Sequence, residues 1–364
     1  MASLGAGVFL AEGFVRLLAP QQLIMDNARI WRPDPLLGWT HREGVDVTIN
    51  TGEQPARFVT DAQGFRIPAP RPEPRDTAGR PRLLILGDSF TEGLMVDAES
   101  TFAGQLERAL AARGLRVTIF NAGVGGWGPV QYALRARQLG DQPFAAVLVC
   151  LFVGNDVLTP ADTALHPTSF GRRARLRWPR APADVTDAWV RPLNDVLEQR
   201  SHLFVFTRVR SAELLARLGL TPYYFPDLFL RATARDPRWA LTADVALRVR
   251  EPFADDGTPV LYVLLPTVYQ VHPDAIEAYL RMFEIAPETV DLDQPQRLLG
   301  AALRARGAQI VDVLPALRAA RQHRLFGQYD QHLNAHGHRR VADALTSAIE
   351  ALLHARPDTT SPAG

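Results

Sequence analysis

Short, wholly apolar segments that alternate with amphipathic ones restrict the fold of this sequence more than any other feature. From Arg82 onward, apolar runs typical of buried strands occur at Leu83–Leu86, Val117–Phe120, Ala145–Val153, Pro259–Leu265 and Gln309–Val313. Between and after them, helical spacing predicts helices within Ser100–Arg113, Val130–Leu139, Ala275–Ile285, Pro295–Arg306 and Ala335–Ala355. Strands that are apolar throughout have no face to turn to water. Their alternation with helices therefore predicts an α/β fold with a parallel sheet that is covered on both faces.

The sequence before this pattern divides into two regions. Residues 1–25 form an apolar N-terminal segment. Residues 26–80 are expected to form a small β-rich region and a linker that is rich in Pro and Arg. The strand-like alternation at Val45–Ile49 and the turn signal at Asp61–Gly64 carry the β prediction.

The α/β domain is predicted to cover residues 81–356. It is interrupted by a long insertion at 157–258, for which we expect a mostly helical structure. Residues 357–364 are expected to be a disordered tail. No internal repeat is evident, so the chain is interpreted as one main domain with additions.

The N-terminal segment leaves two interpretations open. It is apolar but carries Glu12 and Arg16, and a membrane-spanning helix needs about 20 mostly apolar residues. The segment is therefore either the end of a membrane anchor or an amphipathic helix that packs on the domain. Membrane association through this segment stays open, and so does the oligomeric state.

Charge and cysteine content exclude several classes of function. The formal net charge is +1, and the 40 basic residues other than histidine are all arginines. A chain this close to neutrality has no overall field to attract nucleic acid, so no nucleic-acid partner is expected. Cys150 is the single cysteine, which excludes an internal disulfide and a multi-cysteine metal site. We expect no cofactor.

Polar motifs follow the predicted strands. They are Gly87-Asp88-Ser89-Phe90, Asn121-Ala122-Gly123-Val124-Gly125-Gly126, Gly154-Asn155-Asp156 and Asp330-Gln331-His332. Ligands of open parallel sheets bind beyond the carboxyl ends of the strands. The motifs are therefore expected to meet in one crevice.

These residue types are the ones that acyl transfer requires. A serine hydroxyl is a poor nucleophile until a base takes its proton, and imidazole does so near neutral pH. A carboxylate on the other ring nitrogen fixes the tautomer and stabilises the imidazolium. The negative oxygen of the tetrahedral intermediate needs preorganised donors. The backbone N–H groups of Ser89 and Gly126 and the side-chain amide of Asn155 are the candidates.

At these motifs the chain resembles the SGNH hydrolases, also called GDSL-like lipases and esterases. The resemblance covers residues 82–355 apart from the insertion. It implies a flavodoxin-like three-layer α/β/α domain in which Ser89 is the nucleophile and His332 the base. It also implies that Asp330 orients His332, and that Gly126 and Asn155 complete the oxyanion hole with Ser89.

The sequence departs from the family pattern at two points. Phe90 stands where leucine is usual, and one residue separates Asp330 from His332 where the family often has two. The second departure bears on the role of Asp330. Asp88 is interpreted as structural, through bonds to loop amides.

The N-terminal region also resembles a bacterial subgroup of this family. The phrases Asp34-Pro35-Leu36-Leu37-Gly38-Trp39 and Asp61-Ala62-Gln63-Gly64-Phe65-Arg66 carry this similarity. It implies a link to envelope polysaccharide and an extracytoplasmic or membrane-associated location, with the cytoplasm as the alternative.

Two other readings of the motifs compete with acyl transfer. The run Gly123-x-Gly125-x-x-Gly128 has the form of a dinucleotide fingerprint, but it follows the second strand of the domain rather than the first. His332, His336 and His338 lie near Asp330 and raise the question of a metal site. Loosely spaced histidines with one carboxylate favour surface or packing roles, so no metal is expected.

The sequence therefore predicts a serine esterase that hydrolyses acyl esters, acetyl esters among them, of a carbohydrate or small molecule. One alternative is an O-acyltransferase that moves the acyl group to a sugar hydroxyl. The other is a carbohydrate-binding module that has kept the fold without catalysis. The intact serine, asparagine and histidine argue against this last alternative.

Overall fold

The structure is a computed structural model that describes residues 2–21, 30–50, 54–68, 79–157, 196–197, 200–217, 227–282, 284–327 and 331–355. Asp330, most of the predicted linker, the first part of the predicted insertion and the predicted tail at 357–364 lie outside these described residues.

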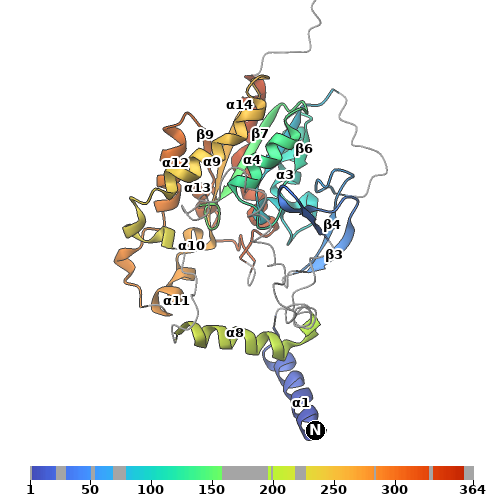
Figure 1. The fold of residues 1–364 in the computed structure, drawn as a ribbon, viewed down its shortest axis with the longest axis vertical. Coiled ribbons are helices and arrows are strands. Elements are labelled where there is room, and N and C mark those ends of the chain that lie inside the picture. Colours follow the sequence, from blue (N-terminus) through green and yellow to red (C-terminus); the bar gives the residue numbers. More distant parts are fainter. Residues whose placement is uncertain are drawn as a thin grey trace, which may run out of the picture.

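A parallel sheet forms the centre of the α/β domain (Figure 1). Its five strands have the order β6-β5-β7-β8-β9, and every neighbouring pair is parallel. The strands are β5 (Arg82–Leu86), β6 (Thr118–Asn121), β7 (Ala146–Phe152), β8 (Val260–Leu265) and β9 (Gln309–Asp312). Numbered within the sheet this order is 2-1-3-4-5, the flavodoxin-like arrangement. The predicted α/β class is confirmed.

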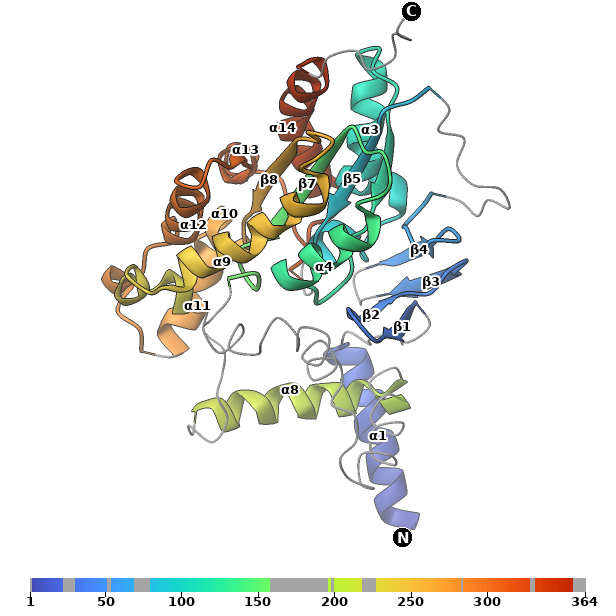
Figure 2. The same ribbon diagram turned by 45° about the horizontal axis from the view of Figure 1, so that its top comes forward.

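Successive side chains of each strand enter two separate cores, one on each face of the sheet. Leu84, Leu86 and Val149 pack on one face, while Leu83 and Cys150 pack on the other. The first face is covered by α4 (Pro129–Leu139), α9 (Arg238–Leu247) and α12 (Gln294–Arg304). The second is covered by α3 (Phe102–Ala112), α13 (Leu314–Ala319) and α14 (Ala335–His354). Figure 2 shows α4 and α9 in front of the sheet and α3 and α14 behind it. Burial on both faces explains why the strands are apolar throughout.

The predicted insertion at 157–258 includes a helix of the main layers. Within the described part of this range lie α8 (His202–Arg217), α9 and several short 3-10 turns. Trp239 and Ala243 of α9 are buried in the core that α4 and α12 share. Parallel strands need a crossover, and in the path from β7 to β8 the helix α9 is followed by a short 3-10 helix (Arg248–Phe253) and then by β8. Helix α9 is therefore part of the layered domain rather than of an added segment.

Two short antiparallel hairpins precede the sheet, as the predicted small β region requires. β1 (Trp31–Asp34) pairs with β2 (Gly38–His41), and β3 (Asp46–Asn50) pairs with β4 (Pro55–Val59). The sequence pattern identified the second hairpin but not the first. After the predicted turn, Arg66 forms an antiparallel bridge with Asn121 at the end of β6. The β region therefore joins the edge of the main sheet.

The N-terminal segment forms α1 (Ala2–Leu18), which contacts α8 at a distance from the sheet (Figure 2). The carboxylate of Glu12 accepts hydrogen bonds from the Ser201 hydroxyl and from the backbone N–H groups of His202 and Leu203. These bonds outweigh the opposing effect of burial and lower the pKa of Glu12 to about 2. Much of the remaining surface of α1 is apolar, with exposed side chains at Val8, Phe9, Leu10, Phe14, Leu17 and Leu18. Among the described residues, no helix combines the length and apolar character needed to cross a bilayer.

Candidate active site

The turn after β5 presents Ser89 at the start of a short helix, α2 (Ser89–Glu92). Asp88 caps this helix, and its carboxylate accepts a hydrogen bond of 2.9 Å from the backbone N–H of Phe90. Gly87 is required by close packing, because a Cβ at this position would lie 2.0 Å from the hydroxyl oxygen of Thr91. The Gly-Asp-Ser-Phe motif therefore encodes a tight strand-to-helix turn that leaves the serine side chain partly exposed.

The structure brings Ser89 and His332 together across 243 positions of sequence. The Oγ of Ser89 lies 2.7 Å from the Nε2 of His332, within hydrogen-bond distance. The loop that carries the histidine is held by a bond from the Gly327 N–H to the His332 carbonyl and by Asn334, which caps α14. The imidazole also packs against the ring of Phe90, with 4.8 Å between the centroids. This geometry suits an imidazole that takes the serine proton.

Both predicted oxyanion donors from other strands reach the same place. Gly126 lies in the loop between β6 and α4, and Asn155 follows β7; both line the cleft in front of Ser89. The φ of Gly126 is 76°, in the left-handed region that favours glycine. The side-chain amide of Asn155 donates a hydrogen bond of 3.0 Å from Nδ2 to Asp88. An amide nitrogen carries two hydrogens, so a second N–H remains for the cleft.

Asp88 connects the turn that carries Ser89 to Asn155 through hydrogen bonds to both. Its side chain is fully buried, and burial raises its pKa to about 6, against the hydrogen bonds from Phe90 and Asn155 that lower it. The positive charge that His332 can carry also favours the ionised form. The sequence interpretation gave this residue bonds to loop amides. The structure adds the bond to Asn155, which fixes the direction of that amide.

The other predicted residues of the histidine cluster are placed apart from the cleft. His338 is buried, and its Nδ1 accepts a hydrogen bond of 3.1 Å from the backbone N–H of Phe102. Burial, with Arg66 and His332 nearby, lowers its pKa to about 3. His336 is exposed on α14. The described residues contain no group of histidine, cysteine and acidic side chains that could hold a metal ion. Asp330 lies outside them.

The cleft in front of Ser89 has a volume of about 370 Å³. Phe90 and Phe152 stack at one side of it, with ring centroids 3.7 Å apart and an interplanar angle of 21°. Residues that follow four different strands and the histidine loop line it: Ser89, Phe90, Gly126, Phe152, Gly154, Asn155, Thr267, Val268, Tyr269, Gln331 and His332. The carboxyl ends of the strands therefore converge on one crevice, as expected for this topology.

Residues 224–361 match the family described as SGNH hydrolase-like domain, acetyltransferase AlgX. This part of the chain is therefore similar to an SGNH hydrolase-like domain. The match includes β8, β9 and His332, whereas Ser89, Gly126 and Asn155 precede it in the sequence.

Several solved structures also resemble the chain. TesA has 14% identity, with 74% of this chain and 99% of TesA covered and a TM-score of 0.38. LAE5, an alpha/beta hydrolase from the metagenome of Lake Arreo in Spain, has 19% identity, coverages of 75% and 96%, and a TM-score of 0.40. The acetyl xylan esterase AlAXEase has 14% identity, coverages of 74% and 99%, and a TM-score of 0.39. Similarity at this level carries no information on substrate. No protein of curated function matches the sequence.

Within the α/β domain, sequence reasoning missed part of the cleft wall. Thr267 lies two residues after the end of β8, so the signal that found Ser89, a polar residue at a strand end, was present there too. Tyr269 also lines the cleft, whereas its neighbour Gln270 and the Trp127 that follows Gly126 do not. Trp127 and Gln270 are buried.

Proposed function

We propose that the protein transfers a small acyl group from an ester through Ser89, and acts as a serine esterase when water is the acceptor. The observation that carries this proposal is the 2.7 Å contact between Ser89 Oγ and His332 Nε2, beside a cleft that Gly126 and Asn155 also line. Serine, base and candidate oxyanion donors are the parts that this chemistry needs.

In the proposed first half-reaction, Ser89 Oγ attacks the ester carbonyl carbon while His332 Nε2 takes the hydroxyl proton. The carbonyl oxygen gains the negative charge, and the Ser89 N–H, the Gly126 N–H and the Asn155 amide donate hydrogen bonds to it. The C–O bond to the alcohol then breaks, and the imidazolium returns the proton to the leaving oxygen. The acyl group is now esterified to Ser89. We assign Asp330 to the other ring nitrogen of His332, as an orienting carboxylate.

In the second half-reaction, His332 takes a proton from water, whose oxygen attacks the acyl-enzyme. Collapse of the second tetrahedral intermediate releases the carboxylic acid and returns the proton to Ser89. The proposed donor is an acetyl or similarly small acyl ester of a carbohydrate. A short acyl group suits a cleft whose side is closed by the stacked rings of Phe90 and Phe152.

The second candidate is an O-acyltransferase, in which a sugar hydroxyl takes the place of water in the second half-reaction. The match of residues 224–361 to a family whose description includes an acetyltransferase favours it. The first half-reaction is the same, so the two candidates share every residue role given above.

A fluorophosphonate probe tests the shared step, because it reacts with activated serines. We expect it to label the wild-type protein and the Ser347→Ala variant but not Ser89→Ala. Ser347 is exposed on α14 and interacts with Arg113, so its loss controls for a general effect of removing a serine. Ser89→Ala should also lower kcat for p-nitrophenyl acetate by several orders of magnitude. Absence of labelling in the wild type would instead favour a binding module without catalysis.

Product analysis separates the two acceptors. p-Nitrophenyl acetate turnover is measured with and without an added sugar, and acetate and acetylated sugar are both quantified. Acetate as the main product in both conditions supports the esterase. Acetylated sugar as the main product would replace the esterase proposal by the acyltransferase.

A further inference from the structure

The β1–β2 hairpin is bonded to the loop that carries Gly126. The indole Nε1 of Trp39 in β2 donates a hydrogen bond of 2.8 Å to the carbonyl oxygen of Gly125. In return, the indole Nε1 of Trp127 donates a bond of 2.9 Å to the carbonyl oxygen of Trp39. Both indoles are buried. These are direct bonds between the N-terminal β region and the edge of the cleft.

The bond from Trp39 acts on the peptide unit that includes the Gly126 N–H. The carbonyl of Gly125 and the N–H of Gly126 belong to one peptide group. Because the described residues contain no cis peptide, these two groups point in opposite directions. An indole that fixes the Gly125 carbonyl on one side therefore also fixes the direction of the Gly126 N–H on the other side, where Gly126 lines the cleft.

The Gly125–Gly126 peptide can adopt two opposite orientations unless a further hydrogen bond fixes one of them. The Trp127 N–H bonds to the Val124 carbonyl at 3.1 Å, so residues 124–127 form a β-turn with Gly125 and Gly126 at its centre. The φ of 76° at Gly126 is that of a type II turn. Types I and II differ by a flip of the central peptide, and glycine at both central positions permits either. In the flipped turn the Gly126 N–H would point to the opposite side.

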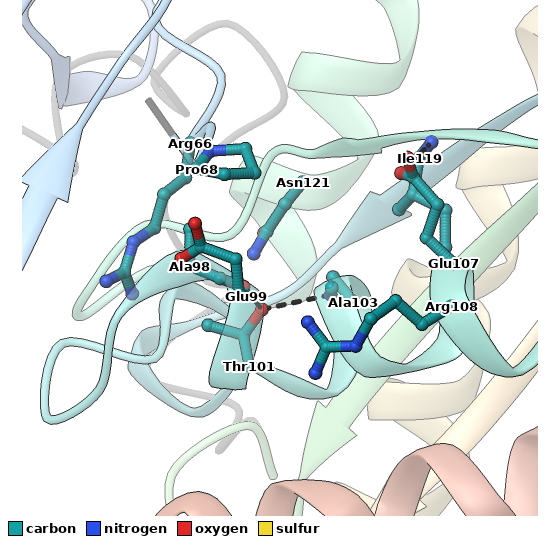
Figure 3. A pocket seen from close by; sticks show the side chains of 11 residues that line it. Arg66, Pro68, Ala98, Glu99, Thr101, Ala103, Glu107, Arg108, Ile119 and Asn121 are labelled. Carbon is teal, nitrogen blue, oxygen red and sulfur yellow. Dashed lines mark hydrogen bonds between the residues drawn. The ribbon is translucent and has the colours of Figure 1, made fainter. Parts of the chain in front are cut away.

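The same β region also forms hydrogen bonds with α2, the helix that begins at Ser89. Glu92, the last residue of α2, accepts hydrogen bonds on Oε1 from the Trp31 indole at 3.0 Å and from His41 Nε2 at 2.6 Å. The buried guanidinium of Arg66 donates to the carbonyl oxygens of Glu92 and Gly93. Figure 3 shows Arg66 near Asn121, on the wall of a pocket beside the start of α3. The β region thus contacts both the serine turn and the glycine turn.

We propose that Trp39 is a positioning residue for the oxyanion hole: its indole N–H selects the type II orientation of the Gly125–Gly126 peptide and so aims the Gly126 N–H at the substrate oxygen. The inference rests on the proposed function, since it assumes that Gly126 is an oxyanion donor. It gives the β region of residues 30–68 a role in catalysis without any contact to substrate.

The test compares Trp39→Phe with Trp127→Phe. Each variant removes one buried indole N–H and one hydrogen bond between the same two segments, but only the first frees the Gly125–Gly126 peptide. Loss of a whole oxyanion donor lowers kcat by about 10²–10³-fold. For a donor that is misdirected part of the time, we expect Trp39→Phe to lower kcat about 10–100-fold, with KM for p-nitrophenyl acetate within about threefold of wild type. Trp127→Phe should keep kcat within about threefold while losing a similar amount of thermal stability.

A second readout separates positioning from general damage. An alkylboronic acid forms a tetrahedral anion on the serine, so its affinity should fall in parallel with kcat in Trp39→Phe and stay unchanged in Trp127→Phe. If Trp39→Phe does not fold, benzothienylalanine at position 39 keeps the ring shape and replaces the N–H by sulfur, and the same fall in kcat is expected.

The inference is overturned if loss of the Trp39 N–H leaves kcat at the wild-type value, or if both tryptophan variants lose kcat equally. Failure of the proposed function has a different signature. In that case the wild-type protein itself is not labelled by the fluorophosphonate and does not turn over p-nitrophenyl acetate.

Discussion

Acidification should destabilise this protein through His338, although the residue lies outside the cleft. The imidazole is buried, accepts the Phe102 N–H on Nδ1, and has its pKa lowered to about 3 by burial and by Arg66. A histidine in the unfolded chain has a pKa of about 6.5. Because the folded pKa is depressed, the stabilising contribution is complete above about pH 6.5 and is lost progressively as the pH falls toward about 3.

The size of the effect follows from the unfolded chain. At about pH 5 the folded state still holds His338 neutral, while the unfolded state has bound the proton. Each pH unit below the unfolded pKa costs about 1.4 kcal/mol, so the loss between about pH 7.5 and about pH 5 is about 2 kcal/mol. Asp88 opposes it: its raised pKa of about 6 means that its ionised form disfavours the fold at neutral pH, and acid relieves this. The wild-type protein alone therefore does not isolate the contribution of His338.

The His338→Asn variant isolates the contribution of this histidine to the pH dependence of stability. In His338→Asn, the side-chain oxygen can still accept the Phe102 N–H, but the group no longer titrates. The variant should be less stable at about pH 7.5, because the ring packing against Phe102 is lost. Its deficit relative to wild type in urea denaturation should then shrink by about 2 kcal/mol at about pH 5. His336→Asn changes an exposed side chain of the same helix, so its stability in urea should show the same pH dependence as that of the wild type. An equal deficit of His338→Asn at both pH values would refute the reasoning.

Two further substitutions test the support beneath the cleft. Asp88→Asn replaces one oxygen of a buried carboxylate, whose pKa is raised, by an NH2 group. The side chain can then no longer accept both the Phe90 N–H and the Asn155 amide, so ester turnover should fall about 10–100-fold while the free energy of unfolding at neutral pH does not decrease. Unchanged kcat in that variant would show that Asn155 needs no such orientation. Tyr132→Phe removes the hydroxyl that donates to the buried carboxylate of Asp156 at 2.9 Å, and urea denaturation should show a loss of about 1–3 kcal/mol. A variant as stable as wild type would contradict this account of the pair.

The sequence was sufficient for features that depend on local pattern. The strands β5 to β9 lie within a few residues of their predicted positions, because a strand buried on both faces must be apolar along its whole length. The positions of Ser89, Gly126, Asn155 and His332 at one edge followed from the rule that parallel strands end on the same side. None of these expectations required knowledge of a specific tertiary contact.

Features that depend on distant partners were missed. β1 and β2 have only four residues each, with a proline in the first, so neither shows strand periodicity. Their stability comes from tertiary bonds such as that of Trp31 to Glu92, which no spacing in the sequence encodes. α9 was assigned to the insertion because the long stretch before it obscured its relation to β8. The bond from Trp39 to Gly125 joins residues 86 positions apart.

The distribution of unfavourable groups gives the site support that does not depend on motif matching. Gln331, next to His332, has a φ of 62°, a left-handed conformation that is uncommon for a residue with a side chain. Glu92 has a buried carboxylate oxygen, Oε2, without a hydrogen-bond partner among the described residues. Asp88 is ionised at neutral pH only against the cost of burial. Such costs persist where the surrounding structure overrides them, and they gather at functional sites. Here Asp88 and Glu92 flank Ser89 on one turn, and Gln331 precedes its proposed base. If these features served the fold alone, relieving them should affect stability and ester turnover in proportion. We assign these features to the positioning of Ser89 and His332. Variants that relieve them are therefore expected to be more stable than the wild type and to turn over ester more slowly.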